Sequence, residues 1–100
     1  MTPEAKVKKQ VVAIIKKFPT AYYFFPATGG YGRSGVPDII ICYCGKFLAV
    51  ECKAGTRKPT PLQEHEMKCI RLAGGEAIVV NEDNVNDVEE RMKACGWITV

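Results

Sequence analysis

The sequence predicts a single α/β domain in which helices flank a mixed central β-sheet. Apolar residues recur at helical spacing before residue 17, two β-prone runs meet at a tight turn at 44–45, and a helical segment from residue 61 precedes a short apolar run. The expected order is a helix, three strands, a helix, a strand and a C-terminal helix. A chain of 100 residues, 47% hydrophobic and 25% charged, has room for one such domain, which spans residues 1–100.

The first helix is expected from Pro3 to about Lys17, with Thr2 as its N-cap. At about 100° per residue Glu4 projects only about 20° from Val11, which lies on the apolar stripe, so we expect Glu4 to point inward. The alternative is a surface ion pair between Glu4 and Lys8, one helical turn later. The residues alone leave these two interpretations open.

The first strand is expected within 21–25, whose aromatic side chains are core residues or, on one face, a subunit contact. The glycine-rich loop 28–35 follows, in which backbone amides can approach a phosphate closely. Arg33 is a candidate phosphate contact there, and Tyr31 is a candidate stacking partner for an unpaired base. The loop lacks the Gly-Lys-Ser/Thr ending of a nucleotide-binding loop, so we expect no nucleotide cofactor.

Two strands on either side of Cys44-Gly45 form the expected hairpin. With a two-residue loop, Asp38 falls directly opposite Glu51, and Lys53 shares their face of the sheet. Two carboxylates roughly 5 Å apart repel by about 3 kcal/mol at an effective dielectric constant near 20. A bound cation reverses that sign. The alternative is that Lys53 neutralises one carboxylate in a structural ion pair, which leaves the other unexplained.

The second half of the chain begins with a basic loop that holds Arg57 and Lys58. Thr60 and Gln63 fit a helix capping box, and that helix is expected to end at Gly74-Gly75. A strand is expected at 76–80. A final helix with Val85, Val88, Met92 and Cys95 on one face is expected to stop at Gly96, and 97–100 form an apolar tail. The lone His65 is expected to be a solvated side chain.

The order and spacing of these motifs resemble a known family. Gly35-Val36-Pro37-Asp38, followed after twelve residues by Glu51-Cys52-Lys53, is similar to the PD-(D/E)XK nuclease superfamily. Glu4, the glycine-rich loop and Gln63 resemble its VRR-NUC branch, the virus-type replication-repair nucleases, in their stand-alone phage form. The resemblance covers about residues 4–80 and implies a restriction-endonuclease-like fold with an αβββαβ core. The C-terminal helix that follows this core is expected from the residues after 80 alone.

The resemblance also implies a metal site for Mg²⁺ or Mn²⁺. Its expected ligands are Asp38, Glu51 and the backbone carbonyl of Cys52, with Glu4 acting through water. Lys53 would orient the attacking water. Gln63 would reach the metal's water shell or a phosphate, in addition to capping its helix.

The charge distribution independently favours a nucleic-acid partner. Residues 1–60 contain ten basic side chains and three acids, for a net charge of +7, and residues 61–100 contain four basic side chains and eight acids, for −4. The three acids of the basic half are Glu4, Asp38 and Glu51. Lys9, Arg33, Arg57 and Lys58 are candidates for phosphate contacts. A solvated lysine face is the simpler alternative.

The cysteines are expected to be reduced. The five cysteines include no C-x-x-C pair, so we expect reduced thiols buried as small hydrophobes rather than disulfides, a zinc site or an iron–sulfur cluster.

The apolar segments indicate the cellular location. The apolar run 10–15 is too short for a signal peptide or membrane span. We expect an intracellular, cytoplasmic protein of a bacterium or a phage-infected cell, with no membrane association.

Together these features predict a divalent-metal-dependent endonuclease that cuts branched DNA such as a Holliday junction. A chain this small has little surface for a four-way junction, whose strands are related by a two-fold axis, so we expect a homodimer. One alternative is a DNA nuclease that acts on flaps, ends or a specific sequence. The other is a non-catalytic nucleic-acid-binding module, against which the intact Asp38, Glu51 and Lys53 argue.

Overall fold

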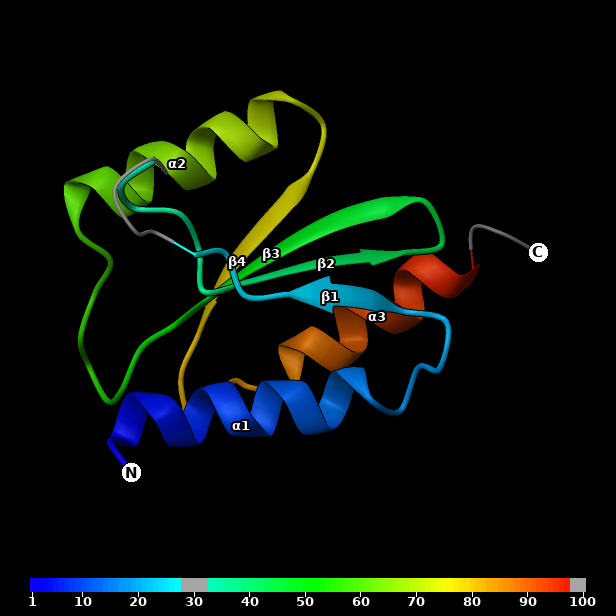
Figure 1. Ribbon diagram of the computed structural model, residues 1–100, viewed down its shortest axis with the longest axis horizontal. Coiled ribbons are helices and arrows are strands. Elements are labelled where there is room, and N and C mark those ends of the chain that lie inside the picture. Colours follow the sequence, from blue (N-terminus) through cyan, green and yellow to red (C-terminus); the bar gives the residue numbers. More distant parts are fainter. Residues whose placement is uncertain (28–32, 98–100) are drawn as a thin grey trace.

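A computed structural model describes residues 1–27 and 33–97 and contains the expected elements in the expected order. They are α1 (Pro3–Ile15), β1 (Tyr22–Phe24), β2 (Ile39–Tyr43), β3 (Lys46–Cys52), α2 (Pro61–Leu72), β4 (Glu76–Val80) and α3 (Asp87–Trp97). The predicted α/β fold class, a mixed sheet flanked by helices, is therefore confirmed (Figure 1). Within the described ranges, none of these helices combines the length and apolar character of a membrane span.

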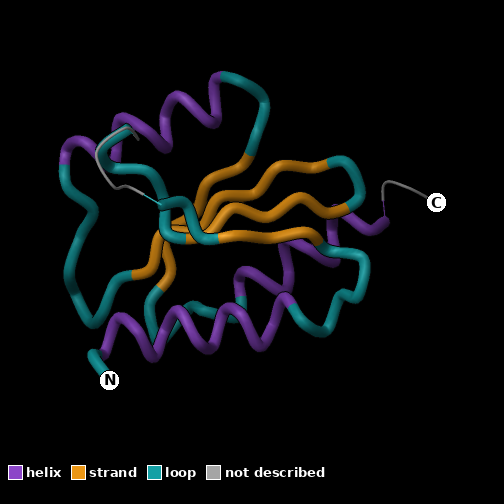
Figure 2. Tube along the Cα trace, viewed as in Figure 1, coloured by secondary structure: helices purple, strands orange, loops and turns teal. Residues whose placement is uncertain are grey.

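The sheet is mixed because α2 carries the chain across it. The strand order is β1-β2-β3-β4, in which the first three strands are antiparallel and β4 runs parallel to β3. A parallel neighbour requires a crossover, which the loop after β3 and α2 supply. The helices α1 and α3 lie on one side of the sheet and α2 lies on the other (Figures 1 and 2).

The turn between β2 and β3 fixes the register that positions the candidate site. Cys44 and Gly45 both have positive φ angles, +52° and +77°, as a type I′ hairpin turn requires. Tyr43 faces Lys46, and the ladder continues to the last pair at the other end of β2. The predicted two-residue loop and register are therefore correct. Asp38 lies one residue beyond this ladder, opposite Glu51.

Two hydrophobic clusters fill the spaces between the layers, because side chains on β2 and β3 alternate between the two faces. The larger cluster joins α1 and α3 to one face of the sheet, and includes Val11, Ile41, Val50 and Met92. The smaller cluster joins α2 to the other face, and its buried members are Ile40, Ala49, Met67 and Ala77. Glu51 and Lys53 follow Ala49 at intervals of two along β3, so they lie on the α2 face.

Two predicted element boundaries are wrong. Helix α1 ends at Ile15 rather than near Lys17, so Phe18 packs against the core from a turn. Helix α3 begins at Asp87, after Val85, and continues through Gly96. A glycine lowers helix stability by only about 1 kcal/mol, so it is a weaker stop signal than proline.

Candidate metal site

Three acidic side chains from separate parts of the chain meet at one end of the sheet. Asp38 directly precedes β2, Glu51 lies near the end of β3, and Glu4 lies in the first turn of α1. Thr2 caps this helix by accepting a hydrogen bond from the amide of Ala5, which fixes where its first turn begins. One carboxylate oxygen from each acid lies within 4.8 Å of the others. The structure thus brings together the three acids predicted to act as ligands.

Asp38 is held in place by the neighbouring strand. Its Oδ2 accepts a hydrogen bond from the backbone amide of Cys52 at 2.9 Å, and its Oδ1 lies 3.7 Å from Nζ of Lys8. The Cys52 side chain points into the opposite core and is fully buried. Burial, and then the charges of Asp38 and Glu51, raise the pKa of the Cys52 thiol to about 12. The thiol therefore stays neutral, so Cys52 could contribute a ligand only through its backbone.

Glu51 is the most unusual residue of the cluster. Its side chain is buried, with 1% of the residue exposed, and its Oε1 has no hydrogen-bond partner among the described residues. Burial, followed by the charge of Asp38, raises the pKa of the Glu51 carboxyl to about 7, although Lys53 acts in the opposite direction. A buried polar atom without a partner costs about 1–3 kcal/mol. Three clustered carboxylates with such an oxygen fit a hard cation that prefers oxygen ligands, as Mg²⁺ and Mn²⁺ do.

Two lysines accompany the cluster. Lys53 is 7% exposed, and its Nζ lies 3.5 Å from Oε2 of Glu51. The structural ion pair considered for Lys53 is therefore present, yet it engages only one oxygen of Glu51. Lys8 is paired with Asp38, whereas the i, i+4 pattern suggested Glu4 as its partner. Helix α1 crosses the sheet end so that Lys8 reaches Asp38, a contact that local spacing does not predict.

A pocket of about 510 Å³ opens beside Asp38, and its lining includes Lys8, Arg33 and Gln63. Gly35 allows the loop before β2 to touch the start of α2. Its φ is +79°, and a Cβ there would lie 2.7 Å from the carbonyl carbon and oxygen of Leu62. This close approach places the start of α2 at the same pocket as Asp38.

Gln63 both caps helix α2 and lines the pocket beside Asp38. Its Oε1 accepts a hydrogen bond from the Thr60 amide at 2.9 Å, while Oγ1 of Thr60 accepts one from the Gln63 amide at 3.2 Å. The predicted capping box is therefore confirmed. Because Gln63 also lines the pocket, the cap fixes the residue at the site. A contact of Gln63 with a metal's water shell or a phosphate stays a prediction.

The predicted DNA contacts have different surroundings. Arg33 lines the pocket, but its guanidinium donates a hydrogen bond to Glu66 at 2.9 Å, and this bond raises the Arg33 pKa. Lys9, Arg57 and Lys58 are exposed, and none of them is among the residues that line the pocket. Tyr31 lies outside the described residues. Sequence reasoning chose Lys9 and missed Lys8 as a pocket residue, although Lys8 lies one turn after Glu4 on the same helix face.

The cysteine prediction holds only in part. The thiols of residues 42, 44, 52 and 69 are free, as expected, but only Cys52 is buried. Cys42 is exposed because β2 turns it toward a part of the sheet face that α2 leaves open. His65 is exposed, as expected, yet its Nε2 lies 3.6 Å from Sγ of Cys69. Their i, i+4 spacing on the expected helix was the available signal for this contact.

Comparison with known proteins identifies the family. No protein-family model matches the sequence. A protein of Acyrthosiphon pisum secondary endosymbiont phage 1, named "Putative nuclease p44", is 33% identical over 86 residues, which span 85% of this chain and 89% of that protein. A solved structure described as a VRR_NUC domain is 25% identical, with a TM-score of 0.75, and the match covers 90% of this chain and 97% of that one. A second, described as a VRR_NUC domain protein, is 22% identical with the same TM-score, covers 95% and 91%, and shows the fold alone. The chain therefore belongs to the VRR-NUC family of nucleases.

Proposed function

We propose that this nuclease is a Mg²⁺- or Mn²⁺-dependent endonuclease that cuts branched DNA, in particular four-way junctions, as a symmetric homodimer. The observation that carries the metal dependence is the unpaired, buried Oε1 of Glu51 inside a cluster of three carboxylates. A cation there would both pair with this oxygen and offset the repulsion between Asp38 and Glu51.

Each residue of the cluster has a distinct role in the proposal. Asp38, Glu51 and the carbonyl of Cys52 would hold the ion, with Glu4 reaching it through water. When bound, the ion supplies charge stabilisation at the phosphate and the leaving oxygen. Lys53 orients the attacking water with its ammonium group, which the side chain of Glu51 keeps close to the ligand set.

DNA would enter beside Asp38. Lys8 and Arg33 line the adjacent pocket and offer cations to the strand backbone, and Gln63 offers a side-chain amide. The exposed Arg57 and Lys58 extend this basic surface along the loop after β3. The three acids of residues 1–60 are those of the cluster, so the other charged side chains of this half are all basic and favour phosphates.

An open apolar face supports the homodimer. The strand register places Tyr22, Cys42 and Phe47 in one row, with Phe24 in the next row on the same face. Tyr22 is 67% exposed, Phe24 45% and Phe47 43%. Helix α2 packs mainly over β4, so the described helices leave this β1–β2 side of the face uncovered. A contiguous apolar patch of this kind is typical of subunit interfaces. Residues 98–100 of the predicted apolar tail lie outside the described residues.

A cleavage assay on defined DNA tests the proposal. The chain should cut a four-way junction when Mg²⁺ or Mn²⁺ is present, and EDTA should stop this cleavage. Flap, single-stranded and linear duplex DNA should be poor substrates. Asp38→Asn removes one charge of the cluster and should abolish cleavage while DNA binding remains. Cleavage in EDTA would contradict the metal dependence. A preference for flaps or ends would support the alternative nuclease activity, and binding without any cleavage would support the non-catalytic module.

The assembly needs its own measurement. Light scattering at micromolar concentration should give a dimer for the native chain and a monomer for Phe24→Lys, because a charge in the centre of the apolar face opposes burial. Leu72→Lys is the matched control, since it places the same charge at another exposed apolar residue, which is 79% exposed at the end of α2 and is not part of the strand rows of Tyr22 and Phe24. A strand-labelled junction should show paired cuts on two opposed strands. A native monomer that nicks one strand would contradict the homodimer.

A further inference from the structure

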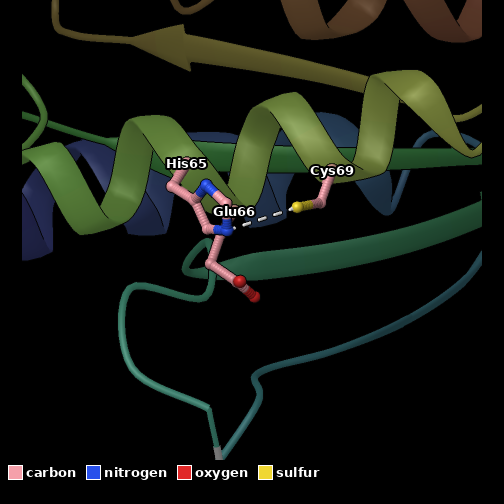
Figure 3. Close-up of side chains that lie close together, drawn as sticks. All are labelled: His65, Glu66 and Cys69. Atoms are coloured by element: carbon pink, nitrogen blue, oxygen red, sulfur yellow. Dashed lines mark hydrogen bonds between the residues drawn. The ribbon is translucent and has the colours of Figure 1, made fainter.

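We propose that α2 carries a second metal site, for a soft divalent cation such as Zn²⁺, formed by His65, Glu66 and Cys69. One ligand atom from each residue lies within 4.8 Å of the others, and Nε2 of His65 lies 3.6 Å from Sγ of Cys69. His65 and Cys69 are one helical turn apart and so share a face of α2. Figure 3 shows the imidazole and the thiol directed toward each other, while the Glu66 side chain extends from the helix below them.

The separation of the imidazole and the thiol matches a bound ion. In a tetrahedral zinc site, with Zn–N near 2.05 Å and Zn–S near 2.3 Å, the nitrogen and sulfur lie about 3.6 Å apart. The observed separation is 3.6 Å. The carboxylate oxygen would need to lie about 3.4–3.6 Å from each of them. It lies within 4.8 Å of both, so a change of the Glu66 rotamer would bring it to the ion. The pair is therefore arranged for an ion without movement of the helix.

The ligand types distinguish this site from the acidic cluster. A thiolate and an imidazole favour Zn²⁺, whereas three carboxylates favour Mg²⁺ or Mn²⁺. The Cys69 thiol would lose its proton to solvent as the sulfur–zinc bond forms, and His65 would bind as the neutral imidazole. Three protein ligands leave one tetrahedral position for water or for a group from another molecule.

Arg33 supports the third ligand. It donates a hydrogen bond to Oε2 of Glu66 at 2.9 Å, which orients the carboxylate and leaves Oε1 for the ion. The same arginine lines the pocket beside Asp38. Glu66 and Cys69 also line a separate pocket of about 380 Å³, bounded by Phe24, Ile40 and other residues. The proposed zinc site thus has a direct side-chain connection to the nuclease pocket.

Zinc titration of the reduced, metal-free chain in millimolar Mg²⁺ tests the site, with a chromogenic chelator as competitor. We expect one Zn²⁺ per chain, with release of about one proton at a pH where the thiol is protonated. Co²⁺ in place of Zn²⁺ should give a thiolate-to-cobalt charge-transfer absorption. Cys69→Ser and His65→Gln should each weaken zinc binding at least about tenfold.

Two controls locate the ion. Cys44→Ser changes another partly exposed thiol, and Asp38→Asn changes the acidic cluster, so neither should alter zinc affinity. Native affinity and charge-transfer absorption in Cys69→Ser would overturn the proposal and leave the His65–Cys69 contact as a hydrogen bond. Loss of zinc binding in Asp38→Asn, with Cys69→Ser unaffected, would assign the ion to the acidic cluster and would also overturn it. Neither result depends on DNA cleavage.

Discussion

Replacing Glu51 by glutamine should stabilise the metal-free fold at alkaline pH while it abolishes cleavage. Burial and the charge of Asp38 raise the pKa of the Glu51 carboxyl from 4.5 to about 7 in the folded protein. The folded state therefore binds this proton more tightly than the unfolded state does. The sign follows from linkage: stability is highest below about pH 4.5 and falls as the pH rises through the window up to about 7.

The expected size follows from the two pKa values. The difference between 4.5 and about 7 corresponds to about 3 kcal/mol of stability lost at high pH, of which about 2.5 kcal/mol is lost between pH 5 and pH 8. Glutamine carries no charge at either pH, so the stability of the variant does not include this pH-dependent decrease. The free energy of unfolding of Glu51→Gln minus that of the native chain should therefore increase by about 2.5 kcal/mol from pH 5 to pH 8.

Urea denaturation in EDTA at the two pH values measures this difference directly. Using the change between pH values removes any constant effect of the new amide on packing. Glu64→Gln is the matched control, because Glu64 is exposed on α2, and its difference from the native chain should stay nearly constant. Adding Mg²⁺ at pH 8 should stabilise the native chain more than Glu51→Gln. A pH-independent difference, or one that decreases toward pH 8, would refute the reasoning from the buried carboxylate.

Three further predictions concern other parts of the site. Lys53→Ala should keep divalent-metal binding, measured by calorimetry, and lower single-turnover cleavage by at least about 100-fold; a native rate would exclude Lys53 from the chemistry. Gly35→Ala should destabilise the fold by about 1–3 kcal/mol in urea, because its Cβ would meet the α2 backbone at 2.7 Å. Gly55→Ala, also at positive φ but with open space, is the control, and an equal loss would show that the contact is unimportant. Replacing Arg57 and Lys58 by glutamine should weaken DNA binding and flatten the slope of log K against log salt by about 2, measured by fluorescence anisotropy; an unchanged slope would place the DNA face elsewhere.

The sequence determined the elements and the register of the hairpin. A two-residue turn at Cys44-Gly45 and the alternation of side chains along a strand leave one pairing, and this pairing sets Asp38 opposite Glu51. Thr2 and Thr60 marked the starts of two helices, because a cap satisfies amides within its own first turn. These features act over a few residues, so local rules suffice to predict them.

The tertiary structure decided which groups meet across the layers. Three features depend on how each helix lies on the sheet: the partner of Lys8, the absence of a partner for Oε1 of Glu51 within the described part of the chain, and the exposure of Tyr22. The contact of Arg33 with Glu66 likewise joins residues that are far apart in the chain. Spacing along the chain specifies only the face on which a side chain projects. The packing of the helices fixes which side chains are buried together, and hence which carboxylate is left to bind a cation.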